Sequence, residues 1–153
     1  MVILRFSASE SLSALAIQFW TWSWPSHVDF ELPDGRLLGA VPGQGVSLRK
    51  IDGTAGKLGR ETRVERYAVH LPLIPAATVI DLAMGQLGRP YDWKAIAGMV
   101  LRHDWKNEKE WFCSELVAWA FKQAGHSILR TDHLDRITPR DLLLSTQLHP
   151  IPA

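Results

Sequence analysis

The strongest structural signal in this chain is a helix predicted over residues 113–124. Its apolar positions recur every three or four residues, and a glycine, typical of a helix C-terminus, follows directly. The apolar stripe consists of Leu116, Val117, Ala120, Phe121 and Ala124. A helix with one such stripe needs an apolar surface to pack against, so the rest of the chain has to supply one.

The first residue of this helix is Cys113, the only cysteine among 153 residues. A thiol at a helix N-terminus meets the positive end of the helix dipole and backbone N–H groups, and both favour the nucleophilic thiolate. Alternatively, Cys113 has no chemical role and is a small hydrophobic residue buried in the core. A single cysteine makes no internal disulfide, so the fold has to be stabilised by its hydrophobic core.

Composition narrows the class of protein. With 46% hydrophobic and 22% charged residues and a net charge of +1, we expect a single domain over residues 1–153 that does not bind nucleic acid. No uninterrupted run of about 18 apolar residues exists, so no integral membrane segment is expected. Because no convincing signal peptide is present, we expect a cytoplasmic protein, or one released or phage-associated by a route that leaves no mark.

The remaining pattern predicts a mixed α+β fold. Alternating residues predict strands over 2–6, 26–32, 36–41 and 62–73, and Pro33-Asp34-Gly35 predicts a hairpin turn between the middle two. Helices are predicted over about 9–20, with Ser7 and Glu10 as capping residues, over 75–87, and over 139–144 after Thr138. Residues 42–60 are glycine-rich and predict a long loop or broken strands. Residues 94–102 predict a short helix or turn.

A cysteine nucleophile needs a base within hydrogen-bond reach. Of six histidines, His27 is the best candidate, because it opens a predicted strand directly after Pro25, where a sheet can present its ring to a facing helix. The other histidines and the single cysteine lack metal-ligand spacing, so neither a metal nor another cofactor is expected. A serine hydrolase is disfavoured because the Gly-x-Ser-x-Gly elbow is absent.

Two segments together resemble a known family. Gly88-Arg89-Pro90-Tyr91 precedes Phe112-Cys113-Ser114-Glu115-Leu116-Val117, as in NlpC-type papain-like cysteine peptidases. The order in which His27 comes before Cys113 is similar to the circularly permuted branch, which includes YiiX-like proteins and lecithin–retinol acyltransferase-like enzymes. The resemblance spans about residues 26–125. It implies a permuted papain-like fold, in which an antiparallel sheet packs against a helix that carries the cysteine at its N-terminus.

The resemblance also implies roles for single residues. Cys113 matches the nucleophile, His27 the general base, and Tyr91 a tyrosine beside the cysteine that assists the oxyanion or the substrate. Family members carry a polar residue on the returning strand to orient the histidine, and here Gly39 stands at that position. Gln44 from the following loop is our candidate for the missing role, and Asp29, interpreted as a solvated strand residue, is the alternative.

The implied reaction is cysteine-dependent hydrolysis of an amide or peptide bond, for instance in bacterial cell-wall peptides, through a thioester. Trp24, Trp93 and Trp111 are expected to wall the substrate site together with Ser114. A lipid acyl hydrolase or acyltransferase of the same fold is the first alternative. A binding module that has lost catalysis is the second, and a component of a larger phage or secretion assembly is the third.

Overall fold

The computed structural model describes residues 1–51, 59–94, 96–97, 110–130 and 136–152. Six strands form one antiparallel sheet in the order β4-β3-β2-β1-β5-β6. The strands are β1 (Val2–Ser9), β2 (His27–Glu31), β3 (Arg36–Val41), β4 (Gly45–Lys50), β5 (Glu61–Val69) and β6 (Leu148–Ile151). The helices are α1 (Leu12–Thr21), α2 (Ala76–Met84), α4 (Cys113–Gln123) and α5 (Pro139–Leu143). The predicted α+β class with an antiparallel sheet is confirmed.

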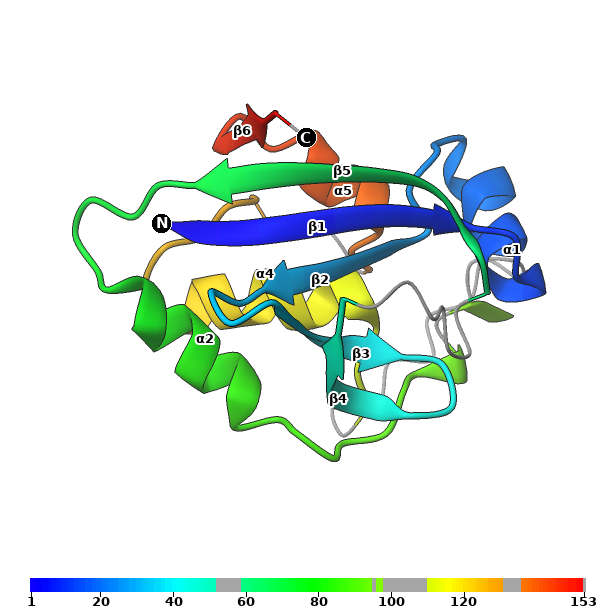
Figure 1. Cartoon of the computed structure of the whole chain (residues 1–153), viewed down its shortest axis with the longest axis horizontal. Coiled ribbons are helices and arrows are strands. Elements are labelled where there is room, and N and C mark those ends of the chain that lie inside the picture. The colour runs from blue at the N-terminus through cyan, green and yellow to red at the C-terminus, as the bar shows by residue number, and fades with distance from the viewer. Residues whose placement is uncertain (52–58, 95, 98–109, 131–135, 153) are drawn as a thin grey trace.

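The core lies between the sheet and α4, which runs behind β2 in Figure 1 with α2 beside it. Alternation along β2 sends Val28 and Phe30 into this core, where the Phe30 ring lies 6.1 Å from that of Phe121 on α4. His27 and Asp29, two residues apart on β2, share one side of the strand with each other. Among the described helices, none is long and apolar enough to cross a membrane.

Several local predictions are confirmed. The β2–β3 hairpin turns at Gly35, whose φ of 77° suits a residue without a side chain. Helix α4 begins at Cys113, as its pattern predicts. Helix α5 follows the N-cap Thr138, whose hydroxyl accepts from Asp141 N while the Asp141 carboxylate accepts from Thr138 N.

Other predictions are wrong at the level of local structure. β1 continues through Ser9, so Ser11 rather than Ser7 caps α1. Residues 45–50 form the regular strand β4, whereas the surrounding glycines had indicated a long loop or broken strands. β6 was not predicted from the sequence; it contains Pro150, which a strand at the edge of the sheet tolerates. The prediction for residues 94–102 lies largely outside the described residues.

Candidate active site

His27 and Asp29 form a buried hydrogen-bonded pair at the start of β2. They are two residues apart on an extended strand, so their side chains lie on the same side. His27 Nε2 lies 2.9 Å from Asp29 Oδ1, and the two residues are only 4% and 1% exposed. Asp29 is therefore not the solvated strand residue that the sequence indicated. It accepts from the imidazole and so fixes the ring's orientation.

Gly39 provides the space that the Asp29 carboxylate fills. The β2–β3 register pairs Phe30 with Leu38, and one further step places Gly39 opposite Asp29. A Cβ atom built on Gly39 would lie 2.0 Å from Asp29 Oδ1, far inside van der Waals contact. The carboxylate thus occupies the volume that a side chain on the returning strand would take. The absence of a polar residue at position 39 is matched by a carboxylate from position 29.

Arg49 on β4 completes the polar cluster. One of its terminal nitrogens lies 2.5 Å from Asp29 Oδ1 and 3.4 Å from His27 Nε2. Burial alone would raise the pKa of Asp29, but the charges of His27 and Arg49 and hydrogen bonds from both outweigh it and lower that pKa well below its ordinary value. Asp29 is therefore a permanent carboxylate at neutral pH.

His27 also reaches Cys113. Burial alone lowers the pKa of His27, but the charges of Asp29 and Cys113 and hydrogen bonds to both raise it from 6.5 to about 9. Because Nε2 faces Asp29, Nδ1 is the ring nitrogen left for the thiol. Cys113 itself is completely buried at the first position of α4, where the N-cap residue Phe112 provides no side-chain hydrogen bond.

Tyr91 is brought to this site by backbone pairing on both sides of its segment. Val46 N donates to Arg89 O at 2.9 Å, and Trp111 N donates to Pro90 O at 3.0 Å. This places Tyr91 next to the residues that lead into α4, with its ring 5.9 Å from that of Phe112. Burial and the charge of Cys113 raise the pKa of Tyr91 well above 10. Its phenol therefore stays a neutral hydrogen-bond donor.

Gln44, our candidate for orienting His27, lies elsewhere. Its side chain is exposed on the turn between β3 and β4, while Asp29 occupies the position beside the imidazole. The sequence did carry a signal for this arrangement. His27-Val28-Asp29 places two polar side chains on one side of a strand, and a glycine on the partner strand leaves room between them.

The three tryptophans expected to bind substrate lie in different surroundings. Trp93 is 53% exposed and its ring lies 5.3 Å from that of Tyr91, so it is close to the cluster and accessible. Trp24 is partly buried beneath the Arg63 guanidinium. Trp111 donates to Gln86 Oε1 and packs against Trp119 of α4, which commits it to holding the helices together.

Ser114 is fully buried, and its hydroxyl donates to Ile137 O at 2.6 Å. This bond ties the start of α4 to the segment before α5, so we assign Ser114 a structural role in place of the substrate-binding one. We expect Ser114→Ala to lower the free energy of unfolding by about 1–2 kcal/mol, because the partly buried Ile137 carbonyl loses its hydrogen-bond donor. Urea unfolding measures this change, and the rate of Cys113 alkylation should stay within about twofold of wild type. A stability unchanged from wild type would contradict the structural role.

Comparison with known proteins identifies a fold and no family. No protein-family model matches the chain, and no curated protein matches it in sequence. Among solved structures, it resembles one described as the metalloprotein yiiX from Escherichia coli O157:H7. The TM-score is 0.74 at 18% sequence identity, over 99% of this chain and 95% of that one. The chain therefore has a yiiX-like fold.

Proposed function

We propose that this protein is a cysteine-dependent hydrolase of amide or peptide bonds, with the peptides of bacterial cell walls as the leading substrate class. The observation that supports this most is the buried His27–Asp29 hydrogen bond, together with Cys113, buried and close enough for its charge to help raise the pKa of His27. A thiol, an imidazole and a carboxylate in this order can form a thiolate–imidazolium pair, the nucleophilic form of a catalytic cysteine. The resemblance to permuted NlpC-type peptidases adds support.

In the proposed reaction, the Cys113 thiolate attacks the substrate carbonyl and forms a tetrahedral oxyanion. The backbone N–H of Cys113 and the Tyr91 hydroxyl donate hydrogen bonds to that oxyanion. Collapse breaks the C–N bond, the amine leaves with the proton of His27, and a thioester remains on Cys113. Water then attacks the thioester while His27 takes a proton from it. The C–S bond breaks, which releases the carboxylic acid and leaves Cys113 as the thiolate. Because Cys113 is completely buried, neighbouring groups have to move before a substrate reaches it.

The solved structure that this fold resembles is described as a metalloprotein, so we tested the cluster as a metal site. Cys113, His27 and Asp29 include ligand types suited to zinc. The position beside Asp29 is filled, however, by the cationic guanidinium of Arg49, which repels a second cation. In the part of the chain that the structure describes, no three His, Cys, Asp or Glu side chains gather to hold an ion. These residues do not fit a metal.

The alternatives lead to different expectations. A missing orienting group for His27 at Gly39 would favour a binding module without catalysis, whereas the Asp29 carboxylate in that space supports catalysis. A lipid acyl hydrolase or acyltransferase would use the same cysteine chemistry on an ester. Substrate class is therefore the difference that an experiment has to resolve.

We expect wild-type protein to form an acyl adduct on Cys113 with a peptide amide, and Cys113→Ala to form none and to lose at least about a thousandfold in hydrolysis rate. Intact-protein mass spectrometry after incubation with peptide p-nitroanilides, cell-wall stem peptides and p-nitrophenyl fatty esters measures both. An adduct with esters alone would favour the lipid alternative. Hydrolysis that survives in Cys113→Ala would contradict the proposal.

A further inference from the structure

Helix α1 is apolar on two sides. Its inner side buries Ala14, Ile17 and Thr21 against the rest of the molecule. Leu12, Leu15 and Phe19, whose helical spacing predicts α1 from the sequence, lie on the opposite side instead. We call this side the outer face; it consists of Leu12, Leu15, Phe19 and Trp22, which are 87%, 50%, 69% and 84% exposed. Surface helices normally carry polar residues there, so the outer face calls for a partner.

The outer face is aromatic and lacks charge. No ionisable side chain occurs from residue 11 to residue 26. The Phe19 ring contacts that of Trp20 edge-on at 5.8 Å and stacks on that of Trp22 at 6.4 Å. Exposed aromatic rings at the end of an uncharged helix suit the interface of a lipid bilayer. There the apolar part of an indole ring contacts acyl chains while its N–H group faces the headgroups.

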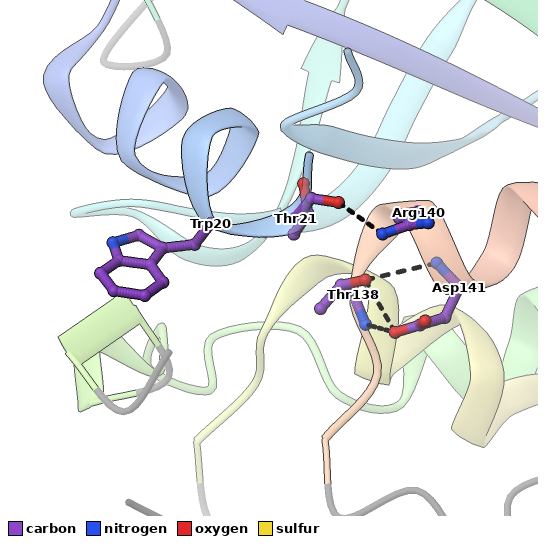
Figure 2. A pocket seen from close by; sticks show the side chains of 5 residues that line it. All are labelled: Trp20, Thr21, Thr138, Arg140 and Asp141. Carbon is purple, nitrogen blue, oxygen red and sulfur yellow. Dashed lines mark hydrogen bonds between the residues drawn. The ribbon is translucent and has the colours of Figure 1, made fainter. Parts of the chain in front are cut away.

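One cationic side chain, Arg140, lies near the C-terminal end of α1. Trp20 lines a pocket of about 240 Å³ together with Thr21, Thr138, Arg140 and Asp141, as Figure 2 shows. Arg140 is exposed and donates to Thr21 O at 2.9 Å, so its bond there is to a neutral carbonyl. The Asp141 carboxylate instead accepts from Thr138 N and Oγ1. A guanidinium therefore lies where apolar surface gives way to polar surface.

We propose that the outer face of α1 docks on an anionic phospholipid bilayer, with Phe19 and Trp22 among the acyl chains and Arg140 at a headgroup phosphate. A second copy of the chain fits less well. A stable dimer buries about 800 Å² on each partner and forms hydrogen bonds across the interface. A ten-residue helix spans only about 15 Å, and its outer face offers hardly any hydrogen-bonding group. This inference is independent of the chemistry at Cys113.

Vesicle co-sedimentation tests the proposal. We expect wild-type protein to bind vesicles of phosphatidylcholine and phosphatidylglycerol in equal parts, and to bind phosphatidylcholine alone more weakly. The double variant Phe19→Ser/Trp22→Ser should bind at least about tenfold less tightly. Leu73→Ser, which changes a 92% exposed leucine between β5 and α2, is the matched control and should bind as wild type does. Cys113→Ala should also bind as wild type does.

Arg140 has its own pair of variants. Arg140→Gln should lose the preference for anionic vesicles, and Arg140→Lys should keep it, because lysine preserves the charge even if the bond to Thr21 is lost. An unchanged preference in Arg140→Gln would overturn the assignment of Arg140. Undiminished binding by Phe19→Ser/Trp22→Ser, or a wild-type dimer in sedimentation velocity that this variant dissociates, would overturn the docking proposal as a whole.

Discussion

Replacing Gly39 with alanine will disable the Cys113–His27 pair, although the residue touches neither of them. The new Cβ would lie 2.0 Å from Asp29 Oδ1, so the carboxylate has to leave its place beside the imidazole. We expect the free energy of unfolding to fall on the order of 3 kcal/mol, from overpacking and from breaking a buried ion pair. Hydrolysis should fall about a thousandfold, because His27 loses its orienting group.

A compensating variant separates this explanation from general damage. Asp29→Gly combined with Gly39→Asp moves the carboxylate to the partner strand without adding a side chain to the space, and should recover part of the activity that Gly39→Ala loses. Gly85→Ala is the matched control, since Gly85 has an ordinary φ of −62° at the end of α2. Urea unfolding and hydrolysis assays on the four proteins measure the effect. A fully active Gly39→Ala would show that Asp29 does not orient His27.

Removing the charge of Asp29 should have an effect of similar size by another route. In Asp29→Asn, burial still lowers the pKa of His27 but the carboxylate no longer raises it, so that pKa should fall from about 9 towards 6.5 or below. At pH 7.5 the imidazole would then be largely neutral. We expect a loss of about a thousandfold to ten-thousandfold in hydrolysis rate at that pH.

The pH dependence of this variant follows from the same shift. In wild type the pKa of His27 is higher in the folded protein than in the unfolded chain, so folding binds a proton more tightly. The stability from this ion pair is complete below about pH 6.5 and is lost as pH rises through about 9. Asp29→Asn should weaken this dependence, because Cys113 remains as the other group that raises the pKa of His27. Urea unfolding between pH 6 and 10 measures it, and identical curves for the two proteins would contradict the assigned role of Asp29.

The sequence predicted much of the fold because its elements carry local signals. The stripe and terminal glycine of α4, the Pro33-Asp34-Gly35 turn and the Thr138 cap each act within a few residues. The sequence of β4 carries no comparable local signal. Gly45 starts it with a φ of 70°, and a Cβ there would lie 2.2 Å from Arg89 O, a contact with a distant segment.

The candidate site was predictable only in part, for the same reason. His27 and Cys113 came from chain order and resemblance, whereas the role of Asp29 depends on a space left by a residue on another strand. Ser114 bonds a carbonyl 23 residues away. The stripe that predicted α1 faces solvent, because helical periodicity shows which residues share a side but not which side is buried.

We propose that His27 holds a proton at neutral pH, between the Asp29 carboxylate and Cys113. The most direct test is an NMR titration of the His27 ring nitrogens, which does not require a substrate or access to the buried thiol. We predict a pKa of about 9 for His27 in wild type and a lower value in Cys113→Ala, because a charge that raises it is removed. A pKa at or below 6.5 in wild type, or one that Cys113→Ala leaves unchanged, would contradict the account.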